Sequence, residues 1–243
     1  MKLLIPAAGR GERFREAGYT TLKPLIKVYD PRDQQNKTMI EAVADSFLNA
    51  PISGYARTKI DQVRIAHPSG YDTEFAGTVN RASFSFVLNP RAEIGQSMSI
   101  LTLLQGEDPM SYVLISNSDV VHDFFYPRLI TEAALHGAVF ACTVFESTDP
   151  SYSYVNSAPY FEATAEKCVI SNYAISGLYY GRVKEIQEAL WKQVAQSMNS
   201  ELFFSEAISF IEGRRLAIVI HKDQVTDLGT PEKLKTNGRF LEV

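Results

Sequence analysis

The chain has 243 residues, of which 45% are hydrophobic and 21% charged, and its formal net charge at pH 7 is −4. This composition fits one globular α/β domain whose core needs no disulfide bonds. Basic and acidic side chains are mixed along the chain without a lysine and arginine block, which argues against a nucleic-acid partner. No apolar run approaches the roughly 20 residues that a membrane helix needs, so we predict no membrane partner either.

The cysteines and the first residues bear on the cellular compartment. Cys142 and Cys168 lie in apolar or β-rich stretches and form no CxxC pair, which favours a reduced intracellular protein. The opening apolar run, 3–8, is too short for the hydrophobic region of a secretion signal. We therefore expect a cytoplasmic protein. The sequence leaves the oligomeric state open, and a homo-oligomer is one of the options.

Strand and helix patterns alternate through the first 145 residues. Apolar, β-branched and aromatic runs predict strands at 3–6, 62–67, 84–88, 112–115 and 138–145, and a short extended piece at 25–28. Helices are expected at 39–48, 71–80, 96–104 and 128–135, and a loop at 7–24. This alternation predicts a mostly parallel central sheet flanked by helices on both faces.

The pattern changes after residue 145. Strands are expected at 152–155, 160–163 and 174–180 with no helices between them, followed by helices at 183–197 and 206–212 and a strand at 216–221. We interpret the three strands as a small antiparallel extension and the last strand as a return to the main sheet. No linker forces a split, so the prediction is a single domain over 1–243.

The loop after the first strand reads Pro-Ala-Ala-Gly-Arg-Gly-Glu-Arg-Phe. Gly9 and Gly11 can adopt positive φ and turn backbone N–H groups toward an anion. The loop is not a Walker A motif, and Phe14 stands where a dinucleotide fingerprint needs its third glycine. Arg13 could bind oxygens of a triphosphate, and Lys23, held by Pro24 at the end of the loop, could neutralise phosphate charge. A plain surface turn and a solvated lysine are the alternatives.

Two aspartates stand at positions suited to a cation. Asp119 follows the strand at 112–115, where open α/β sheets bind their ligands, and it offers a hard oxygen ligand for Mg²⁺. A turn or helix-capping aspartate is the alternative. Asp227 precedes Thr230 and Pro231, which are typical of a helix start, and it could complete a Mg²⁺ site with Asp119.

Four motifs in this order, IPAAGRGERF, AGYTTLKPLIKV, LISNSD and DLGTPEKL, resemble the sugar-phosphate nucleotidyltransferase family. The opening is most similar to its members associated with capsules and surface polysaccharides. The resemblance implies a GT-A-like α/β fold and Mg²⁺-dependent transfer of NMP from an NTP to a sugar 1-phosphate, with release of pyrophosphate. It also implies a nucleotide-binding part over about 1–145 and an acceptor-binding part over about 146–225.

The resemblance further implies a role for particular residues. It assigns Ala8, Gly9, Gly11, Arg13, Lys23, Gly95 and Gln96 to the nucleotide, Arg13 and Lys23 to catalysis, Glu166, Lys167 and Gly177 to the acceptor, and Asp119 and Asp227 to Mg²⁺. Some features depart from the family pattern: Cys168 replaces the usual proline after the Glu-Lys pair, and the loop begins PAAG rather than LAGG. The insert 30–37 lengthens the turn before the first expected helix and has no assigned role.

Three other functions remain as alternatives. The nearest is a CTP-dependent cytidylyltransferase that acts on phosphocholine or another small phosphorylated acceptor. A GT-A glycosyltransferase usually has a DxD motif, where this chain reads Asn-Ser-Asp. A non-catalytic nucleotide-sugar sensor need not keep Lys23, Asp119 and Asp227 together. The four histidines show no metal spacing and are expected at the surface or at strand ends.

Overall fold

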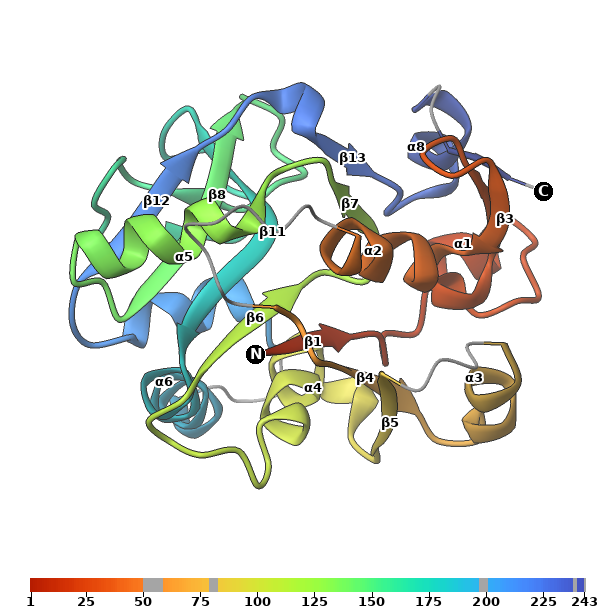
Figure 1. Ribbon diagram of the computed structural model, residues 1–243, viewed down its shortest axis with the longest axis horizontal. Helices are drawn as coiled ribbons and strands as arrows, with labels where there is room; N and C mark the ends of the chain where they lie inside the picture. The colour runs from red at the N-terminus through yellow and green to blue at the C-terminus, as the bar shows by residue number, and fades with distance from the viewer. Residues whose placement is uncertain (50–58, 79–82, 197–200, 238–239, 243) are drawn as a thin grey trace.

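The protein is a three-layer α/β/α structure in a computed structural model that describes residues 1–49, 59–78, 83–196, 201–237 and 240–242. A twisted central sheet has helices on both faces, and β1, near the N-terminus, lies in its middle (Figure 1). The predicted fold class, a mostly parallel sheet flanked by helices with smaller antiparallel parts, is confirmed.

The strands and helices follow one another as in Figure 1. The strands are β1 (Lys2–Pro6), β2 (Lys27–Asp30), β3 (Gln35–Thr38), β4 (Gln62–Pro68), β5 (Phe84–Asn89), β6 (Tyr112–Ser116), β7 (Val120–His122), β8 (Phe140–Glu146), β9 (Tyr154–Val155), β10 (Thr164–Ala165), β11 (Tyr173–Arg182), β12 (Arg215–Val219), β13 (Val225–Asp227) and β14 (Leu241–Glu242). The helices are α1 (Glu12–Glu16), α2 (Met39–Leu48), α3 (Asp72–Thr78), α4 (Gln96–Leu103), α5 (Tyr126–Leu135), α6 (Val183–Gln196), α7 (Phe204–Ala207) and α8 (Pro231–Thr236). None of the helices in the described ranges is both long enough and apolar enough to cross a bilayer.

The main sheet has the strand order β12-β8-β11-β6-β1-β4-β5. β1 is parallel to β4 and β6, β4 is parallel to β5, and β8 is parallel to β12. β11 runs antiparallel to both of its long neighbours, β6 and β8. The carboxyl ends of β1 and β6 therefore lie side by side, and the loops that leave them line one cleft.

Alternating side chains of the sheet divide the core into two clusters. On β1, Leu3 and Ile5 pack with α2 and α5, whereas Leu4 points to the other face and packs with α4 and α6. All three side chains are fully buried. Because both faces are covered, the strands read as continuous apolar runs, as expected of a parallel sheet.

Several expectations differ from the observed elements. The expected loop 7–24 contains the short helix α1, and β9 and β10 contain two residues each. The stretch 160–163 forms no strand; only Tyr160 makes an isolated bridge, to Leu216. β11 lies inside the main sheet rather than in an extension, because its largely buried apolar residues pair on both sides.

The insert 30–37 forms the hairpin of β2 and β3 rather than a longer turn. Lys37 is buried, and its Nζ lies 3.2 Å from Asp30 Oδ2 and 2.7 Å from Asp45 Oδ2. The Arg32 guanidinium donates to Asp30 at 2.9 and 2.7 Å. Burial alone would raise the pKa of Asp30, but Arg32 and Lys37 lower it below the ordinary value. These ion pairs tie the hairpin to α2, which carries Asp45.

Candidate active site

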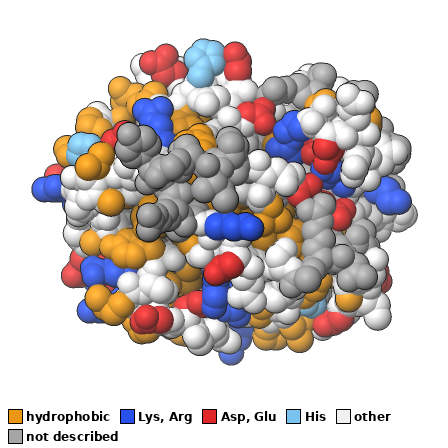
Figure 2. Space-filling view, in the orientation of Figure 1, with side chains coloured by type: hydrophobic (Ala, Val, Ile, Leu, Met, Phe, Trp, Pro, Cys, Tyr) orange, Lys and Arg blue, Asp and Glu red, His pale blue; other side chains and the backbone are white. Residues whose placement is uncertain are grey.

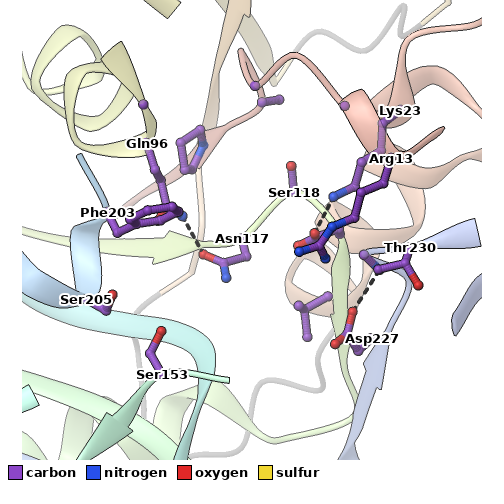
Figure 3. Close-up of a pocket in the computed structure, with 18 of the residues that line it drawn as sticks. Arg13, Lys23, Gln96, Asn117, Ser118, Ser153, Phe203, Ser205, Asp227 and Thr230 are labelled. Atoms are coloured by element: carbon purple, nitrogen blue, oxygen red, sulfur yellow. Dashed lines mark hydrogen bonds and ion pairs between the residues drawn. The ribbon is translucent and has the colours of Figure 1, made fainter. Parts of the chain in front are cut away.

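A cleft of about 690 Å³ opens beside the carboxyl ends of β1 and β6. Its lining comes from segments far apart in the chain: the loop after β1, the start of α4, the turn after β6, residues between β8 and β11, and the turn before α8. Figure 3 shows Arg13 and Lys23 on one side of the cleft and Gln96 and Phe203 on the other. On the face shown in Figure 2, acidic and basic side chains are interspersed.

Asp119 and Asp227 are brought together by the short strands β7 and β13. These strands are antiparallel, and Asp227 pairs with Val120, the residue after Asp119. The Leu228 N–H donates to the Asp119 carbonyl at 2.8 Å, which continues the pairing past the strand. Two acidic residues that are distant in the sequence therefore face the same part of the cleft.

Gly229 leaves room between the two carboxylates. A Cβ atom at this position would lie 2.8 Å from Asp227 Oδ1 and 3.0 Å from Asp119 Oδ2. Because Asp227 Oδ1 and Asp119 Oδ2 both lie close to this Cβ position, the distance between the two oxygens cannot exceed the sum of these two distances. The Gly229 N–H also donates to Asp227 Oδ1 at 2.7 Å and orients that carboxylate. The absence of a side chain here keeps a small polar space open.

Each carboxylate has a lysine as counter-ion. Lys23 Nζ lies 2.5 Å from Asp119 Oδ2, and Lys233 Nζ lies 2.6 Å from Asp227 Oδ2. Burial by itself would lower the pKa of Lys233, but the hydrogen bond and charge of Asp227 raise it on balance. Among the described residues no group of three or more His, Cys, Asp or Glu side chains could hold a metal ion. A cation here would have these two carboxylates as its protein ligands.

The glycine loop packs directly against Lys23. Gly11 has a φ of 61°, and a Cβ there would lie 3.2 Å from Lys23 Cβ. Lys23 begins a short 3-10 helix, Lys23–Leu25, and its ammonium lies 5.8 Å from the centre of the Phe14 ring. Gly9, Gly11 and Arg13 all line the cleft on this side. Arg13 and Lys23 thus place two basic side chains beside the glycine loop on one side of the cleft.

The opposite side of the cleft carries amide side chains. Gln96 Nε2 donates to Asn117 Oδ1 at 2.7 Å, as Figure 3 shows. Gly95, with a φ of 116°, approaches the Leu202 backbone so closely that a Cβ would lie 2.7 Å from Leu202 N and O. Gly177, with a φ of 87°, makes the same kind of approach to the Asn117 side chain, at 2.6 Å from its Nδ2. Gly177 therefore makes room for the Asn117 side chain, and Gly95 lets the start of α4 lie close to the Leu202 backbone.

Glu166 lies in the part of the cleft formed after β8. Its Oε2 accepts hydrogen bonds from the hydroxyls of Ser153 and Ser205, the latter at 2.5 Å. Its Oε1 lies 3.6 Å from Lys167 Nζ. The Lys167 ammonium is also 4.5 Å from the centre of the Phe203 ring. This part of the cleft thus offers a carboxylate, hydroxyls, a cation and an aromatic face.

The structure brings most of the predicted site residues to one cleft. Those that line it are Gly9, Gly11, Arg13, Lys23, Gly95, Gln96, Asp119, Glu166, Lys167 and Asp227. Ala8 and Gly177 lie outside this lining: Ala8 is buried in the core, and Gly177 packs on Asn117. The sequence reasoning missed Asn117, Tyr152, Ser153, Phe203, Ser205 and Lys233, which also line the cleft. Asn117 and Lys233 had a signal, because they lie inside the motifs LISNSD and DLGTPEKL.

His122 lies behind the carboxylates and is fully buried at the end of β7. Its Nε2 faces the Ser176 carbonyl at 3.2 Å, whereas its Nδ1 has no hydrogen-bond partner among the described residues. Burial lowers the pKa of His122 from 6.5 to about 4, against the opposing effects of the Ser176 carbonyl and of Asp119. The folded protein therefore holds this imidazole neutral.

The buried imidazole predicts a loss of stability in mild acid. Because the pKa is lower in the folded state, the unfolded chain takes up the proton first, at about pH 6.5. Above that pH this histidine does not lower the free energy of unfolding. The free energy of unfolding falls by about 3 kcal/mol as the pH drops to about 4, the pKa of His122 in the folded protein. Urea unfolding of the wild type and His122→Gln across this window measures the effect. Equal pH slopes for the two proteins would contradict it.

Comparisons with known proteins bear on the fold. No family model matches the chain, and no curated protein sequence matches it. A nucleoside-diphosphate-sugar pyrophosphorylase structure from Vibrio cholerae RC9 matches with a TM-score of 0.76 and 21% identity, over 97% of this chain and 98% of that one. A Bacillus anthracis structure described as a glucose-1-phosphate thymidylyltransferase in complex with a sucrose matches with a TM-score of 0.73 and 15% identity, over 98% and 93%. The chain therefore shares the fold of these two structures.

Proposed function

We propose that the protein is a nucleotidyltransferase that transfers NMP from an NTP to a sugar 1-phosphate and releases pyrophosphate, with Mg²⁺ as cofactor. The observation that carries this proposal is the meeting of Asp119 and Asp227 at Gly229, in a cleft that also contains the glycine loop and Lys23. The matching folds of a nucleoside-diphosphate-sugar pyrophosphorylase and a thymidylyltransferase support it. A role in making surface-polysaccharide precursors rests on the resemblance of the opening motif alone.

The two carboxylates fit a Mg²⁺ ion. Carboxylate oxygens are hard ligands, and Mg²⁺ in enzymes is usually held by one or two of them together with substrate phosphates and water. Asp119 Oδ2 and Asp227 Oδ1 both border the small space at Gly229 that a Cβ would fill. Asp119 and Asp227 would hold the ion, which when bound would withdraw negative charge from the phosphate under attack.

The residues of the chain would lower the repulsion between two anionic substrates. An oxygen of the acceptor phosphate attacks the α-phosphorus of the NTP, and the bond from that phosphorus to the bridging oxygen of pyrophosphate breaks. No enzyme nucleophile is needed, because the acceptor is already an anion. Lys23 and Arg13 would offset charge on the triphosphate, and the loop at Gly9 and Gly11 would orient it.

Glu166 is suited to accept hydrogen bonds from the hydroxyl groups of a sugar acceptor. In the protein alone its Oε2 already accepts two serine hydroxyls, from Ser153 and Ser205. Sugar hydroxyls can make the same kind of hydrogen bond with this carboxylate. Lys167, beside Glu166, would bind the phosphate of the acceptor.

A panel of four NTPs crossed with phosphorylated acceptors, read by pyrophosphate release, tests the proposal. We expect release with a sugar 1-phosphate and Mg²⁺, and none after chelation of the cation. Release only with CTP and phosphocholine would make the protein a cytidylyltransferase of that type. No release with any pair would refute the proposal; tight nucleotide-sugar binding would then indicate a sensor, and sugar transfer from a nucleotide sugar a glycosyltransferase.

A further inference from the structure

Lys233 is a second lysine at the paired carboxylates. The resemblance gave α8 no part in the site, yet its third residue reaches back into the cleft. The ammonium lies 2.6 Å from Asp227 Oδ2, 4.4 Å from the centre of the Tyr152 ring and 3.5 Å from Ser151 Oγ. Lys233 thus forms an ion pair with Asp227, just as Lys23 does with Asp119.

The two lysines lie toward different sides of the cleft. Lys23 packs on Gly11 and lies over Phe14, so it belongs to the side of the glycine loop. Lys233 contacts Tyr152 and Ser151, which immediately precede Ser153, one of the partners of Glu166. An ammonium released from Asp227 would therefore remain beside the acceptor half of the cleft.

A divalent cation and the lysines compete for the same carboxylates. When a cation takes over the neutralisation of Asp227, the nearby ammonium loses its counter-charge and is repelled by the ion. Lys233 has a flexible side chain that is 30% exposed, while Thr230 Oγ1 accepts from its backbone N–H at 3.1 Å and anchors its Cα. The side chain can therefore move without disturbing the start of α8.

We propose that Lys233 is an exchangeable counter-ion, displaced from Asp227 by the divalent cation and then bound to the acceptor phosphate. This inference rests on the proposed function and deepens it. Cation binding would release two lysines from their carboxylates. Lys23 would then bind the NTP, and Lys233 would bind the acceptor. The cation would thereby prepare the cleft for anions before either substrate arrives.

Titration of the whole protein with Mn²⁺, without nucleotide, tests the exchange directly. Because Lys233→Met removes the competitor, we expect it to bind Mn²⁺ about five- to tenfold more tightly than the wild type. Lys235→Met, which removes a lysine of the same helix outside the cleft lining, should change the affinity by less than about twofold. Lys233→Arg should not bind more tightly than the wild type. Unchanged or weaker binding by Lys233→Met, or an equal gain in Lys235→Met, would overturn the inference.

Inorganic phosphate, as a probe for the acceptor phosphate, tests the second step. At saturating Mn²⁺ we expect Lys233→Met to bind phosphate about tenfold more weakly than the wild type, and Lys233→Arg to retain most of the affinity. Equal phosphate affinity in Lys233→Met and wild type would refute transfer to the acceptor. Neither titration depends on turnover. The titrations can therefore contradict the role of Lys233 while pyrophosphate release supports the proposed function, or support that role while no pyrophosphate is released.

Discussion

Asp119→Asn is expected to lower kcat/KM for Mg²⁺-dependent pyrophosphate release by at least about 10³-fold while leaving the protein folded. Asparagine has nearly the same shape, and its oxygen can still accept the hydrogen bond that Lys23 donates to Asp119. What is lost is the negative charge, and with it one of the two proposed anionic ligands of the cation. Steady-state kinetics, together with Mn²⁺ titration and thermal unfolding, would separate loss of the site from loss of the fold.

A matched control lies at the other end of the same strand. Asp123 follows β7 as Asp119 precedes it, and it lies outside the cleft lining, so Asp123→Asn should retain activity within about twofold. Because Asp119 and Asp227 are expected to act as one unit, adding Asp227→Asn to Asp119→Asn should cost little more than either change alone. An Asp119→Asn protein with more than a tenth of wild-type activity would show that the cation site lies elsewhere.

Local patterns predicted much of the fold. The bounds of α2 agree with the apolar spacing, and its start has a purely local cause: Thr38 and Glu41 form a capping box. The helix expected after Thr230 also forms, with Pro231 at its first position and Thr230 as its cap. Buried strands such as β6 were equally evident, because a run of apolar residues between turns has few other uses. In each case the information lies within a few neighbouring residues.

Features that depend on distant pairing could not be predicted in the same way. β7 and β13 have three residues each, too few for a periodic signal, yet their pairing positions both carboxylates. The positions of Asp119 and Asp227 in the sequence, and then the family resemblance, suggested a shared Mg²⁺ site, but no local pattern predicted the strand pairing that brings them together. Lys233 shows the limit most clearly, because a lysine in the first turn of a capped helix resembles any solvated lysine in sequence. In the structure, the turn at Gly229 and the cap at Thr230 place it beside Asp227.

Gly229 is the second position where a substitution should have a large effect on activity. Gly229→Ala is expected to lower kcat/KM by about 10²-fold with little loss of stability. The added methyl group would lie 2.8 Å from Asp227 Oδ1 and 3.0 Å from Asp119 Oδ2, which is too close for either oxygen. Both atoms end side chains, so the carboxylates can move aside and the fold need not change, but their common orientation is lost. Gly77→Ala, where a Cβ meets nothing within 4 Å, is the matched control and should keep full activity. Kinetics and Mn²⁺ titration of both variants decide the matter: unchanged cation affinity in Gly229→Ala would mean that the space between the carboxylates is not where the ion binds.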